Sequence, residues 1–145
     1  MEETRRIKDT LEFLTSVEEE HTASTGLHLG IFDISSAQQQ QHKKLLGAVA
    51  IQEINTSNHS GLIGCWLSAE SQGKGLATIA CLKIIEYGRK VIGIVQFELH
   101  TAVNNHRTQA LAERLNFKRA PGVIKSAEVI DSKPVDHLVY VLDNQ

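Results

Sequence analysis

A glycine-rich turn joins a strand-like segment to a helix-like segment, and this junction constrains the fold more than any other feature of the sequence. Residues 60–70 are apolar and contain β-forming side chains, which predicts a strand. From Leu76 to Tyr87 the apolar residues recur at spacings of three and four, which predicts a helix with one broad apolar face. Residues 72–77 therefore form a strand-to-helix turn. Such a turn is either an anion-binding loop, since helix N-termini expose N–H groups, or a plain glycine-rich turn.

Two well-known phosphate loops do not fit this turn. A Walker A loop requires Gly-x-x-x-x-Gly-Lys-Ser/Thr, but Ser68 stands where its first glycine should be and Gly75 follows Lys74. The dinucleotide fingerprint requires Gly-x-Gly-x-x-Gly after the first strand, but Thr78 stands where the third glycine should be. The turn is therefore neither of these.

Composition and charge exclude several other classes of protein. A chain of 145 residues is one domain by size, and its net charge of −2 disfavours nucleic-acid binding through a general basic field. No apolar run approaches the length of a membrane span, and no basic-then-apolar segment opens the chain, so we expect neither a membrane partner nor a signal peptide. Cys65 and Cys81 fall in a predicted strand and a predicted helix, and we expect buried thiols in a reducing, cytoplasmic setting.

The order of predicted elements indicates a mixed sheet with helices on its faces. The sequence predicts helices at 1–22, 76–87 and 104–116, with the two asparagines at 104 and 105 as the N-cap region of the last helix. Residues 35–44 form a polar, glutamine-rich loop. We expect strands at 27–33, 45–54, 60–70, 94–103, from Phe117 onward, and at 135–143. This α-β-β-β-α-β-α-β-β order fits an α/β (α+β) domain without repeats over residues 1–145.

The turn and its surroundings resemble the GNAT acetyltransferases. Gln72-GKGL-Ala77 is similar to the Gln/Arg-x-x-Gly-x-Gly/Ala loop of that family. Three blocks in the right order, residues 63–78, 99–117 and 122–141, resemble the RimJ/RimL type, which acetylates the N-termini of ribosomal proteins. The resemblance covers roughly residues 5–143 and implies the GNAT fold. Members of this group begin with a further strand and helix, so we expect the N-terminal strand to be missing and the sheet edge to be covered by a longer chain or by a homodimer.

The resemblance implies a binding site for acetyl-CoA. The backbone of the turn would hold the pyrophosphate, with Lys74 adding charge or standing as an ordinary solvated lysine. The strands ending at Leu67 and Ala102 would separate, and the Leu67 N–H would stabilise the thioester oxyanion. Asn105 would reach the cofactor arm or simply cap its helix. The implied cofactor-binding residues are Leu67, Gln72, Gly73, Lys74, Gly75, Leu76, Ala77 and Asn105.

The resemblance also implies two catalytic residues. Thr108 matches a family serine that protonates the departing thiolate, and Glu128 matches the glutamate that takes the proton of the acceptor amine. A surface glutamate is the alternative for Glu128, which would share a strand face with Ser126. Trp66 is expected in the core, with the acceptor channel as the alternative. The seven histidines show no metal-ligand spacing, so no metal is expected; His100 could act as a second base or hold a water, and His137 is expected to be structural.

These expectations lead to one function with two alternatives. We expect an acetyl-CoA-dependent N-acetyltransferase that acts by direct attack in a ternary complex, with a protein N-terminal α-amine as the acceptor. Acetylation of a small amine is the second possibility. A degenerate acyl-CoA-binding module is the third.

Overall fold

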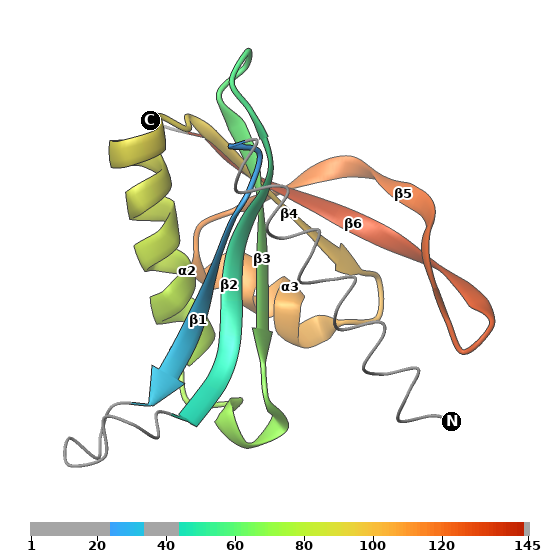
Figure 1. Ribbon diagram of the computed structural model, residues 1–145. Helices are drawn as coiled ribbons and strands as arrows, with labels where there is room; N and C mark the ends of the chain where they lie inside the picture. Colours follow the sequence, from blue (N-terminus) through green and yellow to red (C-terminus); the bar gives the residue numbers. More distant parts are fainter. Residues whose placement is uncertain (1–23, 34–43, 144–145) are drawn as a thin grey trace.

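The computed structural model describes residues 24–33 and 44–143, which form a mixed six-stranded sheet with two α-helices (Figure 1). The predicted helix at 1–22 and all but the last residue of the predicted loop at 35–44 lie outside the described residues. The elements follow the predicted order. The strands are β1 (Leu27–Asp33), β2 (Lys44–Asn55), β3 (Ser60–Leu67), β4 (Gln96–Ala102), β5 (Lys118–Ile130) and β6 (Lys133–Asp143), and the α-helices are α2 (Leu76–Tyr87) and α3 (His106–Arg114).

The sheet has the strand order β1-β2-β3-β4-β6-β5, which confirms the predicted mixed α/β architecture. The first three strands form an antiparallel meander, as expected from the short turn after β2. The β3 and β4 strands are parallel, because α2 forms the crossover between them. The β6 strand lies between β4 and β5 and is antiparallel to both.

One predicted strand ends early in the structure, and one helical turn was not predicted. The strand predicted at 60–70 ends at Leu67, because the chain then forms a 3₁₀ turn, η1 (Ala69–Ser71). Ser68 closes that turn: its carbonyl accepts from the Ser71 N–H at 2.9 Å, and the two hydroxyls lie 2.8 Å apart. The sequence did not indicate the π-helical turn, η2 (Gly88–Ile92), that follows α2.

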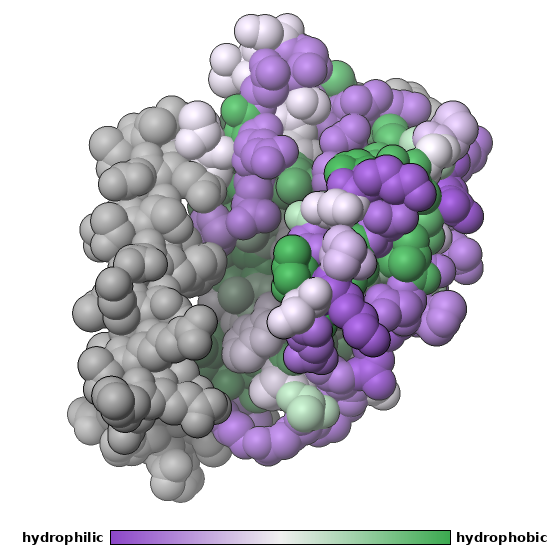
Figure 2. Space-filling model, turned by 90° about the vertical axis from the view of Figure 1, so that its right-hand side faces the viewer, coloured by the Kyte–Doolittle hydropathy of each residue, from purple (hydrophilic) through white to green (hydrophobic). Residues whose placement is uncertain are grey.

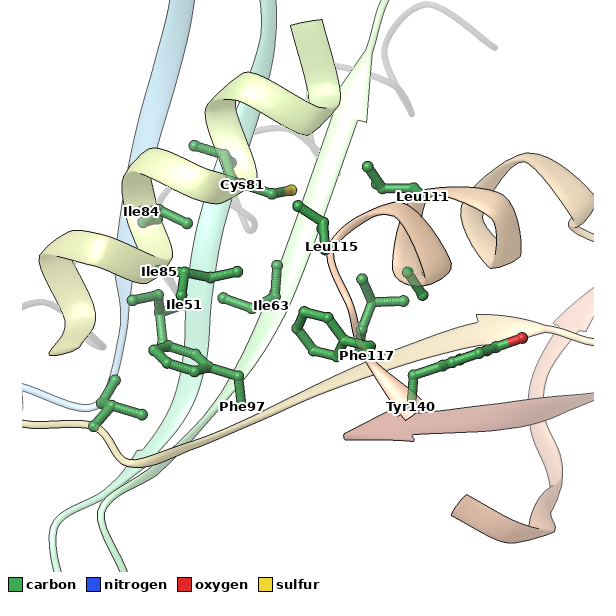
Figure 3. Packing of buried hydrophobic residues seen from close by; sticks show 14 of the residues in the cluster. Ile51, Ile63, Cys81, Ile84, Ile85, Phe97, Leu111, Leu115, Phe117 and Tyr140 are labelled. Carbon is green, nitrogen blue, oxygen red and sulfur yellow. The ribbon is translucent and has the colours of Figure 1, made fainter. Parts of the chain in front are cut away.

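Both helices pack on one face of the sheet and bury its apolar side chains. Figure 3 shows Ile84 and Ile85 of α2 near Ile51 and Phe97 of the sheet, and Cys81 of α2 and Leu111 of α3 belong to the same buried cluster. Phe97 of β4 is fully buried at 0% exposure. The alternation of apolar residues along β2, β3 and β4 thus supplies the core face, as period-two patterning requires.

The β3 and β4 strands separate halfway along their length. They pair only from Ser60 opposite Gln96 to Ile63 opposite Leu99, although β3 runs on to Leu67. Beyond that point β3 continues along β2, and β4 continues along β6. The expected separation is therefore present, and it leaves strand edges facing each other without a shared ladder.

Candidate active site

A cleft of about 1060 Å³ occupies the gap where β3 and β4 separate. The cleft also reaches the start of α2, the face of α3 and the β5–β6 hairpin. Most of the residues predicted for the site line it together: Leu67, Gln72, Gly73, Gly75, Leu76, Ala77, Asn105, Thr108 and Glu128. Lys74 is the predicted residue that does not line the cleft, and its side chain is exposed.

The glycine turn owes its shape to backbone conformation. Gly73 and Gly75 have φ angles of 78° and 77°, in the left-handed region that other residues rarely adopt. A Cβ on either would meet nothing within 4 Å, so crowding is not the constraint. Gly75 is the N-cap of α2 and offers no side-chain hydrogen bond to the first turn. The first-turn N–H groups of α2 are therefore available to an anion in the cleft.

Gln72 connects the end of β3 to α3. Its Nε2 donates to the carbonyl oxygen of Leu67 at 3.1 Å, and its Oε1 accepts from the Nη1 of Arg107. Arg114 lies seven residues after Arg107 in α3, and its Nε donates to the Thr78 hydroxyl at 3.3 Å. Both arginines line the cleft, so two cations lie close to the glycine turn.

The sequence reasoning missed these two arginines although a signal was present. Arg107, Leu111 and Arg114 stand at i, i+4 and i+7, which places them on one face of a helix. Leu111 is buried against the core, so the same stripe also points along the cleft. The signal in the sequence was a pair of basic residues on the same helix face as an apolar residue.

Backbone direction places the Leu67 N–H on the side of the gap. The Ser68 N–H donates to the Leu46 carbonyl of β2 at 2.8 Å. Consecutive amides of an extended strand point to opposite edges, so the Leu67 N–H points away from β2 and toward the separated β4. This direction is the one an oxyanion donor in the cleft would need.

Asn105 and Thr108 form the start of α3. The Asn105 Oδ1 accepts from the Thr108 N–H at 3.2 Å, which is a standard N-cap contact. The predicted cap region is thus confirmed. Both side chains also line the cleft, so the capping role and a role toward a bound cofactor are compatible.

Glu128 lines the cleft in contact with His137. The His137 Nε2 lies 2.9 Å from the Glu128 Oε1, and the two side chains are 19% and 45% exposed. Ser126 is not among the residues that line the cleft, although a regular strand would put it on the face of Glu128. The expectation of a shared face assumed regular alternation. A register shift between Ile124 and Glu128 interrupts that alternation, and Ser126 has a φ of 49°.

The favoured core position for Trp66 is wrong. Its side chain is 59% exposed and lines the cleft, which is the alternative placement. Trp66 lies opposite Ala48 of β2, on the sheet face away from the buried Ile63. Strand alternation fixed the face but could not show how much of that face is covered.

The two cysteines are free thiols in different surroundings. Cys81 is fully buried, as expected, whereas Cys65 is half-buried and lines the cleft. A hydrogen bond from the Cys81 thiol to the Cys65 sulfur lowers the pKa of Cys65. The same hydrogen bond, with burial and the nearby charge of Cys65 adding to it, raises the pKa of Cys81. Cys65 is therefore the more readily ionised thiol of the pair.

The described ranges, 24–33 and 44–143, contain no group of three or more His, Cys, Asp or Glu side chains placed to hold a metal ion. No helix within these ranges is long and apolar enough to cross a membrane.

The separated strands, the glycine turn and the cleft fit the family whose sequence profile matches this chain. The profile described as "Acetyltransferase (GNAT) domain" matches residues 1–118. The chain belongs to the GNAT acetyltransferase family.

Relatives of this GNAT chain carry names that indicate different acceptors. It is 32% identical over 73 residues to the "Putative ribosomal N-acetyltransferase YdaF" of Bacillus subtilis (strain 168), covering 50% of this chain and 40% of that protein. It is 29% identical over 79 residues to the spermidine N(1)-acetyltransferase of Vibrio cholerae serotype O1 (strain ATCC 39315 / El Tor Inaba N16961), covering 54% of this chain and 46% of that protein. The matched segments span less than half the length of either relative.

A solved structure supports the same fold over most of the chain. The microcin C7 self-immunity acetyltransferase MccE, solved in complex with acetyl-CoA and AMP, superimposes with a TM-score of 0.76 at 30% identity. The match covers 94% of this GNAT chain and 71% of the other.

Proposed function

We propose that this chain transfers the acetyl group of acetyl-CoA to a primary amine, with a protein N-terminal α-amine as the acceptor. One observation carries the proposal: a single cleft joins the glycine turn at the start of α2, the opened edges of β3 and β4, and the carboxylate of Glu128. The YdaF relative, whose name refers to the ribosome, supports the choice of acceptor. Two free thiols suit the reducing cytoplasm, where such an acceptor is found.

The glycine turn and α3 would bind the cofactor. The backbone N–H groups of the turn would hold the pyrophosphate, together with Arg107 and Arg114. Lys74 would add charge from outside the cleft. The unshared edges of β3 and β4 would pair with the amides of the pantetheine arm, and Asn105 lies at the cleft wall where it could reach that arm. No resident cofactor or metal is part of this proposal.

Three residues would carry the chemistry. Glu128 takes a proton from the acceptor amine, which lets the amine attack the thioester carbon directly. The Leu67 N–H stabilises the negative charge that develops on the carbonyl oxygen. Thr108 donates its hydroxyl proton to the departing thiolate. Both reactants occupy the cleft at once, so transfer needs no acetyl-enzyme step.

A small polycationic amine is the second candidate acceptor. The spermidine acetyltransferase relative favours it, and so does a carboxylate next to the cleft. The His100 Nε2 lies 3.2 Å from the Glu98 Oε2, so a second carboxylate stands beside the cleft-lining His100. The exposed ring of Trp66 could add a cation–π contact.

The test is acetyl-CoA-dependent thiol release with two acceptors, an N-terminal peptide of a ribosomal protein and spermidine. We expect turnover with the peptide and weaker turnover with spermidine; the reverse ranking would favour the small-amine alternative. CoA binding without turnover on either would indicate a binding module. Light scattering on the same sample would decide whether the chain forms the homodimer that an exposed sheet edge would favour.

A further inference from the structure

We propose that Asp136 and His137 are positioning residues that hold the carboxylate of Glu128 toward the cleft. This inference rests on the proposed function, because it assigns those residues to the proposed base. Its structural basis is separate: side chains of two consecutive residues in β6 reach the irregular part of β5 that carries Glu128.

The backbone ladder alone does not fix the position of Glu128. In β5 the pairing with β6 jumps from Ile124 opposite His137 to Glu128 opposite Val135, so three residues of β5 stand against one of β6. Packing does little to fix this part of β5, because β5 is exposed along most of its length and Val129 is 70% exposed. Figure 2 looks at the hairpin side of the molecule, where hydrophobic residues lie scattered among hydrophilic ones.

Asp136 anchors the part of β5 in which three residues stand opposite it. Its Oδ1 accepts from the Ser126 N–H at 2.9 Å, and its Oδ2 pairs with the Lys125 Nζ at 3.1 Å. The backbone of Asp136 is itself held just after the end of β4, since its carbonyl accepts from the Val103 N–H at 3.0 Å. The carboxylate therefore ties the bulge to the central part of the sheet.

His137 contacts the carboxylate of Glu128 itself. Its Cα partner in β4 is Ala102, at the end of the strand that borders the gap, and its side chain is only 19% exposed. The ionisable side chain in contact with it is Glu128, and the neighbouring Asp136 pairs with Lys125. The Nε2 contact uses Oε1 of Glu128 and leaves Oε2 to take the proton of an amine.

Such fixation matters because proton transfer requires a defined geometry. A displacement of about 1 Å can cost roughly 100-fold in rate. A glutamate on an exposed, bulged strand would otherwise sample many rotamers. The contacts made by Asp136 and His137 of β6 restrict the Glu128 side chain to the cleft.

The first test compares two variants of His137. His137→Leu removes the Nε2 contact, whereas His137→Gln places an amide donor at a similar reach and should restore it in part. We expect kcat to fall at least about tenfold in His137→Leu, less in His137→Gln, with the Kd for CoA unchanged. In a Glu128→Gln background, His137→Leu should cause no further fall, because the two act through one group. An equal fall in both backgrounds, or wild-type kcat in His137→Leu, would overturn the proposal.

The second test does not depend on activity, so it separates this inference from the proposed function. Hydrogen exchange of the Ser126 amide should speed up at least about tenfold in Asp136→Ala and much less in Asp136→Asn, which keeps an oxygen acceptor. Asp131→Asn, in the same hairpin but outside these contacts, is the matched control and should leave the exchange unchanged. Unchanged exchange in Asp136→Ala would refute the anchoring role even if acetyl transfer is intact. A wild-type protein without acetyl transfer would refute the function but not the anchor.

Discussion

The side-chain amide of Gln72 donates to the carbonyl oxygen of Leu67 at 3.1 Å, and Arg107 donates to the same glutamine. These contacts join the glycine turn, the end of β3 and α3, which are the three sides of the proposed cofactor site. The residue that would donate to the oxyanion is thus bound directly to the turn that would hold the pyrophosphate. Cofactor binding and the geometry of the reaction centre should therefore depend on the same side chain.

Gln72→Leu should weaken CoA binding. It removes two hydrogen bonds, one of them from a charged donor, and neutral bonds contribute about 0.5–1.5 kcal/mol each while charged ones contribute more. Since about 1.4 kcal/mol is tenfold in affinity, we expect the Kd for CoA to rise about three- to thirtyfold in calorimetric titrations. Lys74→Gln, at an exposed position outside the cleft, should change the Kd less. Wild-type affinity in Gln72→Leu would show that the link to Leu67 and Arg107 does not support the site.

Replacement of Gly75 should separate backbone strain from charge. Gly75→Ala must adopt a φ of 77°, which costs about 1–2 kcal/mol, so the Tm should fall while CoA still raises it. Gly75→Asp should lose the CoA-dependent rise, because its carboxylate faces the phosphates. Gly93→Ala is the control, with a φ of 86° and open space around the Cβ but outside the cleft. A Gly75→Asp protein that CoA stabilises as it does the wild type would exclude the turn as the phosphate site.

Cys65 should react with iodoacetamide before Cys81. The hydrogen bond from Cys81 lowers the pKa of Cys65, and Cys65 lines the cleft while Cys81 is buried. Saturating CoA should slow the modification because the cleft is then filled. Peptide mass spectrometry over time measures both rates, with Cys65→Ser as the control. Earlier labelling of Cys81, or no protection by CoA, would contradict this placement of the cleft.

The anchor formed by Asp136 should release in acid. Its pKa lies below the ordinary value of 3.8, first because the Ser126 N–H donates to it and then because Lys125 does. A lowered pKa means that the contribution to stability is present above pH 3.8 and is lost as the pH falls through the lower folded value. The NMR shift of the Ser126 amide should titrate with a midpoint below pH 3.8 and should not do so in Asp136→Asn. A midpoint above 3.8 would show that the contact is absent in solution.

The pattern of apolar residues predicted most of the described fold. Runs of apolar, β-forming residues predicted the strands, and apolar residues at spacings of three and four predicted α2, because these elements bury continuous apolar faces. Ser68 ended β3 early through a local side-chain contact that periodicity does not carry. The separation of β3 from β4 followed from the family resemblance, since nothing in either strand alone indicates where pairing stops.

Within the site, the sequence indicated residue types better than orientations. Trp66 was misplaced because alternation assigns a face without showing whether that face is covered. The contact between Glu128 and His137 could not be predicted, because it depends on a bulge that Asp136 stabilises from another strand. Contacts of this kind join residues nine or ten positions apart, across a turn whose register the sequence leaves open.

The kcat of Glu128→Gln is the most direct test of the central claim, that Glu128 is the base for acetyl transfer in this cleft. Glutamine keeps the shape of the side chain but cannot take a proton from the amine. A positioned base contributes about 100- to 10,000-fold, so kcat with saturating acetyl-CoA and peptide should fall within that range while the Kd for CoA stays at the wild-type value. Wild-type kcat in Glu128→Gln would contradict the account and leave Glu128 as a surface residue.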